Sequence, residues 1–125
     1  MSNGAIYMKG TLLFVSSDAA SAFVETLSGE AEWISQHVSW FMYRPDSTTC
    51  CWTLVHGSSE LFVESWRYLM ASAELMVRFR GASSSDWHVV GSLSSGAGAE
   101  LDLFTGAFPS AKLTRCTVRG GFVTR

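Results

Sequence analysis

The stretch Glu32–Gly57 constrains the fold of this chain more than any other. Its first half alternates apolar and other residues, and an extended strand would place five side chains on one face: Ile34, Gln36, Val38, Trp40 and Met42. Residues 44–47 (Arg-Pro-Asp-Ser) have turn composition, because proline presets φ and aspartate can bond to its own backbone. Cys50–His56 is again apolar and favours a strand. We therefore predict a central β-hairpin.

The elements before and after this hairpin follow from hydrophobic spacing. Ile6–Val15 is apolar on both faces, as expected of a central strand. Ala19–Leu27 has helical spacing and follows serines that can cap a helix. Leu61–Met70 has the same features and predicts a second helix. Leu75–Arg80 alternates, which favours a strand.

The last third of the chain predicts loops and further strands. Residues 81–86 and 94–98 have loop composition. Strands are predicted at Trp87–Leu93, Glu100–Thr105, Lys112–Arg119 and Phe122–Thr124, with a hairpin turn at Gly120-Gly121. The chain is therefore predicted to be one α+β domain over residues 1–125. Its sheet would be predominantly antiparallel with two helices, in the order β-α-β-β-α-β followed by three or four strands. The first six elements are compatible with a ferredoxin-like split βαβ.

Charge and cysteine content narrow the class of protein. The net charge is −2, which does not favour nucleic-acid or anionic-membrane binding. The first ten residues lack the basic and apolar regions of a signal peptide, and no apolar run is long enough to span a bilayer. Three cysteines, two of them adjacent, make a poor disulfide framework. We therefore predict reduced thiols and a cytoplasmic location.

Two adjacent cysteines and His56 are candidates for a metal or thiol site. Cys50, Cys51 and His56 lack the paired spacing of structural zinc sites, and Cys116 is distant in the sequence. Free cysteines are most often small buried hydrophobes. We therefore predict no metal, no cofactor and no catalytic residue here, and a nucleophilic cysteine beside a histidine stays an alternative.

Two histidines lie among polar neighbours. His37 falls between Ser35 and Ser39 on the polar face of the predicted hairpin, where it could serve in acid–base chemistry or face solvent. Asp86 and His88 are two residues apart on a predicted strand edge, so they share a face and can interact. A surface pair beside a loop is the favoured interpretation of these two residues.

Arginines recur at strand spacing in two places. Arg78 and Arg80 would share one face of their strand, and Arg115 and Arg119 one face of another. If these strands are neighbours, the four guanidinium groups form a cationic strip that suits an acidic partner. The alternative is a solvated face neutralised by nearby carboxylates.

Three aromatic residues fall on the hairpin face that also carries His37: Trp33, Phe41 and Tyr43. If the other face forms the core, these rings are exposed or covered by another part of the molecule. Exposed tryptophan and tyrosine often anchor interfaces.

One passage resembles a viral family. The run LFVESWRYLMASAELMVRFRG, a polar loop and WHVVGSL look like the helix–strand–loop–strand passage of jelly-roll coat proteins of small RNA viruses. The resemblance implies a self-assembling structural subunit.

The sequence thus predicts a non-enzymatic protein-binding module, such as a small cytosolic inhibitor or immunity-type protein, whose partner has an acidic surface. The predicted contact residues are Trp33, His37, Tyr43, Arg78, Arg80, Arg115 and Arg119. The alternatives are a coat-like structural subunit and a small enzyme or ligand-binding domain. In the latter, His37, Cys51 or His88 would line a pocket.

Overall fold

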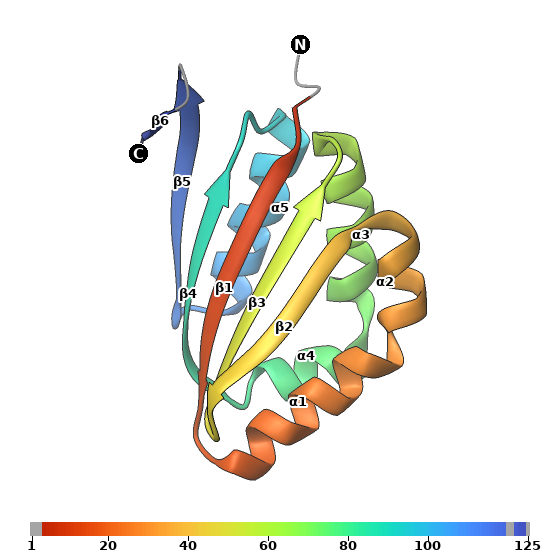
Figure 1. Ribbon diagram of the computed structural model, residues 1–125, viewed down its shortest axis with the longest axis vertical. Coiled ribbons are helices and arrows are strands. Elements are labelled where there is room, and N and C mark those ends of the chain that lie inside the picture. The colour runs from red at the N-terminus through yellow and green to blue at the C-terminus, as the bar shows by residue number, and fades with distance from the viewer. Residues whose placement is uncertain (1–3, 120–121, 125) are drawn as a thin grey trace.

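The computed structural model describes residues 4–119 and 122–124, with the side chains of residues 37 and 117–124 outside that description. Figure 1 shows a twisted sheet with helices packed on one of its faces. The elements in chain order are β1 Ile6–Phe14, α1 Ser17–Gly29, α2 Ala31–His37, β2 Ser39–Asp46, β3 Thr49–His56, α3 Ser59–Ala71, α4 Ala73–Phe79, β4 Ala82–Val90, α5 Ser95–Ala107, β5 Ala111–Arg119 and β6 Phe122–Thr124.

The strands of the sheet lie in the order β2-β3-β1-β4-β5-β6. Strand β1 is central and pairs antiparallel with both β3 and β4, as its apolar sequence predicted. Strand β2 pairs antiparallel with β3 and forms one edge of the sheet. Strand β5 pairs parallel with β4, and α5 makes the crossover between them that a parallel pair requires.

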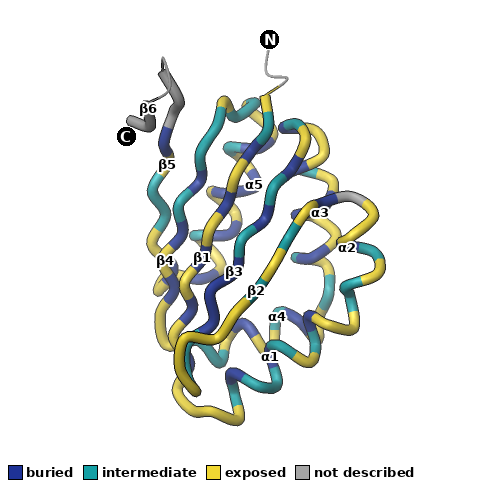
Figure 2. The backbone as a smooth tube through the Cα atoms, viewed as in Figure 1, coloured by how far each residue is buried: buried dark blue, intermediate teal, exposed yellow. Residues whose placement is uncertain are grey.

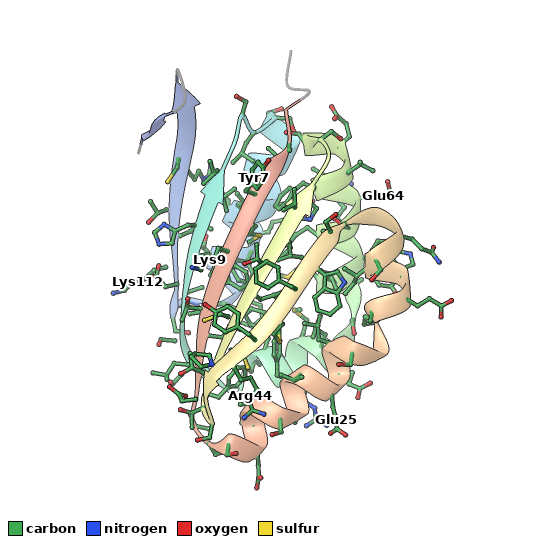
Figure 3. The ribbon with its side chains drawn as sticks, viewed as in Figure 1. Tyr7, Lys9, Glu25, Arg44, Glu64 and Lys112 are labelled. Carbon is green, nitrogen blue, oxygen red and sulfur yellow. The ribbon has the colours of Figure 1, made fainter. Side chains whose placement is uncertain are left out.

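The two faces of the sheet differ in burial, because side chains of a strand alternate between them. Along β1, residues alternate strictly between buried and exposed, which Figure 2 shows as alternating colours. The buried side chains meet the helices in a single core rich in aromatic rings. Figure 3 shows Tyr7 and Lys9 on the other face, away from the helices that carry Glu25 and Glu64. We call this other side the open face.

The two long helices predicted from the sequence are confirmed, with their caps. The Ser16 hydroxyl accepts a hydrogen bond from the Ala19 backbone N–H (3.1 Å) at the start of α1. The Ser58 hydroxyl does the same for the Leu61 N–H (3.2 Å) at the start of α3. Each hydroxyl satisfies one N–H that the first helical turn leaves without a partner.

The first strand of the predicted hairpin is wrong in its first half. Residues 31–37 form helix α2, and only Ser39–Asp46 is strand. Ile34 and Val38, which suggested alternation, are four residues apart, and this spacing also suits a helix. Both side chains are buried, and the Val38 N–H bonds to the Ile34 carbonyl (2.8 Å) as the helix ends. The second strand is confirmed as β3, but the turn predicted at residues 44–47 is displaced, because β2 continues to Asp46 and the chain turns at residues 47–48. The Asp46 carboxylate accepts from the Thr48 N–H (3.0 Å) at this turn.

Two further predicted strands are helices. Leu75–Arg80 lies in α4 and its C-cap, where Leu75 and Phe79 are buried one turn apart while Val77 is 57% exposed. Glu100–Thr105 lies in α5, with Leu101 and Phe104 in the core. Over about six residues, the spacing of apolar side chains fits both a strand, with a period of two, and a helix, with a period of 3.6. Residues 94–98 were predicted to be a loop because of their glycines, but α5 begins at Ser95. The loop predicted at residues 81–86 is mostly strand, because β4 begins at Ala82.

The predicted α+β class therefore holds, and its details need correction. The described residues contain five helices rather than two, and the β4–β5 pair is parallel. The order β-α-β-β-α-β is kept when α2 and α4 are counted with the helices they follow. The jelly-roll resemblance fails, because its predicted strand is α4. The predicted turn at Gly120-Gly121 lies outside the described residues. No helix in the described part of the chain is long and apolar enough to cross a membrane.

Candidate ligand-binding site

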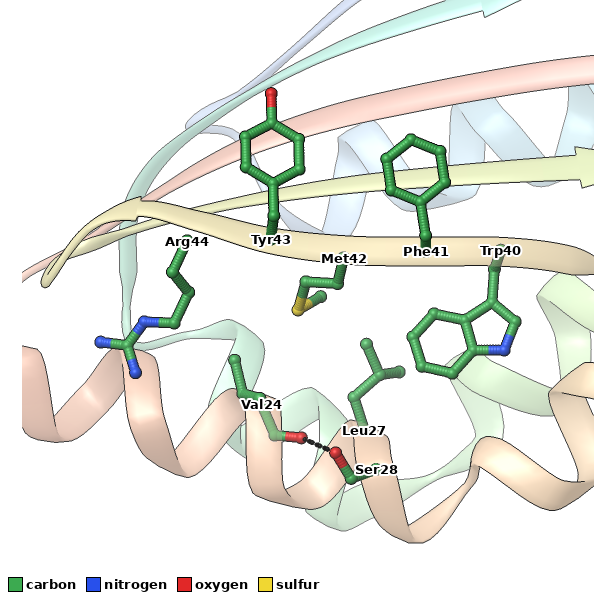
Figure 4. Close-up of a pocket in the computed structure, with 8 residues that line it drawn as sticks. All are labelled: Val24, Leu27, Ser28, Trp40, Phe41, Met42, Tyr43 and Arg44. Carbon is green, nitrogen blue, oxygen red and sulfur yellow. Dashed lines mark hydrogen bonds between the residues drawn. The ribbon is translucent and has the colours of Figure 1, made fainter.

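A cavity of about 480 Å³ lies between helix α1 and the edge strand β2. We call it the α1–β2 cavity, and Figure 4 shows its walls. Its volume falls within the range of small-molecule sites. Eight residues line it: Val24, Leu27, Ser28, Trp40, Phe41, Met42, Tyr43 and Arg44.

The strand wall of the cavity follows from the alternation of β2. Trp40, Met42 and Arg44 point toward α1, whereas Phe41 and Tyr43 point to the open face (Figure 4). Because β2 is an edge strand, it pairs with β3 on one side only. Its second row of backbone N–H and C=O groups therefore lacks a strand partner.

The helix wall of the cavity is apolar. Val24, Leu27 and Ser28 share a face of α1 because they are spaced three and four residues apart. The Ser28 hydroxyl donates to the Val24 carbonyl (2.8 Å), as the dashed line in Figure 4 marks. This internal bond occupies the hydroxyl proton, so the middle of the cavity offers few free polar groups.

The two ends of the cavity differ chemically. At one end the Trp40 indole N–H donates to the Ser35 hydroxyl (3.1 Å), which fixes the ring. At the other end Arg44 donates through Nη1 to the Ser21 hydroxyl (3.0 Å) and through Nη2 to the Ser47 carbonyl (2.5 Å). No carboxylate of the described residues forms a salt bridge with Arg44. The cavity thus runs from a fixed aromatic ring to a guanidinium without a counterion.

The floor of the cavity includes Met42, which pairs across β2–β3 with Trp52. Trp52 is buried, and its indole N–H has no hydrogen-bond partner among the described residues. Methionine is flexible, so the Met42 side chain can adapt its shape to a molecule in the cavity. An unpaired buried N–H costs free energy, which a guest with an acceptor could recover.

His56 is a second buried polar side chain, at the end of β3. Neither ring nitrogen makes a hydrogen bond within the described structure, and the ring packs edge-on against Phe62 at 5.0 Å between centroids. Burial lowers the pKa of His56 to about 4, and the neighbouring Ile6 backbone opposes the change. The imidazole is therefore neutral at pH 7 and belongs to the core rather than to a pocket.

The aromatic residues of the predicted interface are dispersed. Trp33 lies in α2, where its ring stacks on Tyr68 at 3.7 Å, rather than on a strand face. Tyr43 is on the open face, where a hydrogen bond with Cys51, the main cause, raises its pKa. His37 ends α2 rather than lying on a strand, and its side chain is outside the described residues.

The predicted arginine strip does not form. Arg78 lies in α4 and Arg80 caps its C-terminus, so neither is on the sheet. Arg115 is on β5 and pairs with Asp102 of α5 (2.8 Å). The side chain of Arg119 lies outside the described residues. The strip is absent because residues 73–79 form a helix that buries Leu75 and Phe79, so Arg78 and Arg80 do not lie on a strand.

The other predicted clusters resolve as follows. Asp86 and His88 share the open face of β4, with 3.9 Å between carboxylate and imidazole. The three cysteines are free and buried, as expected of small hydrophobic residues. Burial raises the pKa of Cys50, and Arg44 opposes this change. No group of three or more metal-ligating side chains occurs among the described residues.

The sequence reasoning missed the α1–β2 cavity although it contained a signal for it. Trp40, Met42 and Arg44 are each two residues apart, so a strand places all three on one face. On that face an arginine follows two apolar side chains. It was assigned to the turn instead. The opposite wall could not be inferred, because it depends on how α1 packs beside the sheet edge.

Comparison with known proteins gives similarity at the level of structure. No family model and no curated protein matches the sequence. MupZ from Pseudomonas fluorescens is 18% identical with a TM-score of 0.56, over 98% of this chain and 90% of that chain. A candidate antibiotic biosynthesis monooxygenase from Caulobacter crescentus is 8% identical with a TM-score of 0.52, over 74% and 93%.

SnoaB, a cofactor-independent oxygenase from Streptomyces nogalater, is 11% identical with a TM-score of 0.47, over 73% of this chain and 94% of that chain. At these identities the likeness concerns the fold.

These findings overturn the prediction of a non-enzymatic inhibitor or immunity-type module. The arginine strip that motivated it is absent from the described sheet, and the fold is shared with a candidate monooxygenase. The alternative of a small enzyme or ligand-binding domain agrees better with the missing strip and with the shared fold. Its pocket, however, is lined by aromatic, aliphatic and arginine side chains rather than by histidine or cysteine.

Proposed function

We propose that this protein is a small enzyme that binds a largely apolar organic molecule in the α1–β2 cavity and oxygenates it. The observation that carries the proposal is the cavity itself, with its aromatic end, apolar middle and single cationic end. Small-molecule sites characteristically combine apolar walls with a few placed polar groups. The reaction class is suggested by the fold shared with the candidate monooxygenase.

The cavity is suited to hold such a molecule out of water. Leu27 is buried, while Val24, Trp40 and Met42 are half-buried and pack against the core. A guest between these side chains would cover apolar surface, at roughly 25 cal/mol per Å² removed from water. The Trp40 ring would offer an aromatic partner a preferred offset or edge-on contact.

A substitution that fills the cavity tests the binding step. Val24→Trp places a large ring between α1 and β2, whereas Val77→Trp places the same ring on the exposed face of α4. Calorimetric titration with a panel of aromatic and alicyclic compounds should find ligands that the wild type and Val77→Trp bind equally well. Val24→Trp should bind these ligands at least about tenfold more weakly. Equal binding by Val24→Trp would overturn the site assignment.

Oxygen consumption tests the reaction step. A bound substrate should draw dissolved oxygen in the wild type, and the rate should fall with binding in Val24→Trp. If ligands bind in the cavity and none causes oxygen uptake, the protein is a ligand-binding domain and the oxygenase assignment is wrong.

A further inference from the structure

We infer that the molecule bound in the α1–β2 cavity is a monocarboxylate with a flat apolar body, its carboxylate paired with Arg44 and its body lying against Trp40. This inference rests on the proposed function and adds a substrate class to it. It depends on the unpaired guanidinium, the fixed indole and the distance between them along β2.

The first argument is the state of the Arg44 side chain. Two of its five N–H donors are used, on the Ser21 hydroxyl and the Ser47 carbonyl. These bonds hold the guanidinium in place without neutralising it, because both partners are uncharged. A fork of remaining donors matches the two oxygens of a carboxylate.

The second argument is the absence of a competing acid around the described cavity. None of its eight lining residues is Asp or Glu. The nearest acid along the strand is Asp46, whose carboxylate accepts from the Thr48 N–H (3.0 Å) and hydroxyl (3.2 Å). Hydrogen bonds to Thr48 and Thr49 lower the pKa of Asp46, so this acid is already satisfied locally. Arg44 is therefore available to a charged guest.

The third argument concerns the size and charge of the guest. Trp40 and Arg44 are four residues apart on one face of β2, which is about 13 Å of strand. This length suits a fused bicyclic ring with one acidic group better than a single small acid. Arg44 is exposed and is the one charged residue that lines the cavity, so a carboxylate matches its charge one to one, whereas a phosphate dianion carries a second negative charge without a partner in the lining.

The fourth argument is the mode of contact at Trp40. Its N–H is engaged by the Ser35 hydroxyl, so the ring contributes its apolar surface rather than a donor. Val24 and Leu27 complete an apolar slot on the α1 side. A polar group in the middle of the guest would lose water without gaining a partner. The acceptor is therefore expected at the Arg44 end.

Matched probes test this inference by calorimetry on the full chain. The probes are 2-naphthoate, neutral 2-naphthamide of nearly the same shape, and 2-naphthyl phosphate. The wild type should bind the carboxylate at least about tenfold more tightly than the amide, as a hydrogen-bonded charge pair implies. It should also prefer the carboxylate to the phosphate, and higher salt should reduce the preference over the amide.

Variants locate the effect. Arg44→Met keeps an apolar stem without the charge and should bind naphthoate and naphthamide equally. Arg78→Met is the control, because Arg78 is an exposed arginine of α4 that does not line the cavity. It should keep the wild-type preference for the carboxylate.

Three outcomes with these probes, and a fourth described after them, would overturn the inference while leaving the cavity assignment intact. They are equal binding of acid and amide by the wild type, tighter binding of the phosphate, and an unchanged preference in Arg44→Met. Binding of neither naphthoate nor naphthamide, while other apolar compounds lose affinity in Val24→Trp, would overturn it as well. If Val24→Trp weakens no ligand at all, the proposed function itself fails.

Discussion

Gly10 of β1 lies directly opposite Trp87 of β4, and the indole ring occupies the space that a Cβ on Gly10 would need. An added Cβ would lie 2.4 Å from Cζ3 of the ring, far inside van der Waals contact. Trp87 is fully buried and packs against Trp52, Trp66 and Phe104 at 5.6–6.0 Å between ring centroids. The absence of a side chain at Gly10 thus allows the aromatic core to close over the central strand.

Gly10→Ala should lower the free energy of unfolding by about 1–3 kcal/mol, because the ring has no free space to move into. Urea denaturation measures the change. Gly106→Ala is the matched control, since a Cβ there meets nothing within 4 Å and the residue lies in helix α5. It should be neutral or stabilising. An equal loss in both variants would contradict the packing argument.

His56 should make the protein less stable as the pH falls from 6.5 to about 4. Its pKa in the folded chain is about 4, below the ordinary value of 6.5. Between these values the unfolded chain binds a proton that the folded chain does not, so unfolding is favoured as acid is added. The stabilisation is complete above pH 6.5, and the loss is roughly 3 kcal/mol at most once pH 4 is passed.

Urea denaturation at a series of pH values measures how the free energy of unfolding changes with pH. His56→Leu should flatten this dependence over pH 4–6.5, whereas His88→Gln, which changes a partly exposed imidazole on β4, should leave it unchanged. If His56→Leu loses stability with falling pH as the wild type does, groups other than His56 cause the acid sensitivity.

Ser72 should matter for stability because it caps helix α4. Its hydroxyl accepts from the Leu75 N–H (3.2 Å) at the point where the sequence favoured a strand. Ser72→Ala should cost about 1 kcal/mol of unfolding free energy. Ser84→Ala, on the exposed face of β4, should cost about 0.5 kcal/mol or less. If the two substitutions have the same effect, Ser72 does not act as a cap.

Met42 should control the depth of the α1–β2 cavity. Met42→Ala removes the side chain opposite Trp52 and should bring the unpartnered indole N–H within reach of a guest. Compounds one ring larger than those bound by the wild type should then gain affinity by about tenfold or more. Met76→Ala, a partly buried methionine of α4, is the control. No gain with Met42→Ala would mean that the cavity does not extend inward.

The sequence by itself determined the features that depend on neighbours along the chain. The caps at Ser16 and Ser58 are local hydrogen bonds, so the starts of α1 and α3 could be read directly. The central position of Ile6–Phe14 was predicted from its apolar residues and is confirmed, although only one face of this strand is buried. The alternation of side chains along β2 was also predicted correctly from Ser39 onward, including the shared face of Trp40 and Met42.

Tertiary structure decided what the local pattern left open. A spacing of four residues places two side chains on the same face of either a strand or a helix. This spacing separates Ile34 from Val38 and Leu75 from Phe79. Burial against the core selects the helix, and Val77 is left exposed as a result. The cavity depends on tertiary packing, because its two walls are α1 and the edge strand β2, which helix α2 separates in the chain. Arg44 lies at one end of the proposed binding site because this packing places α1 beside the apolar face of β2.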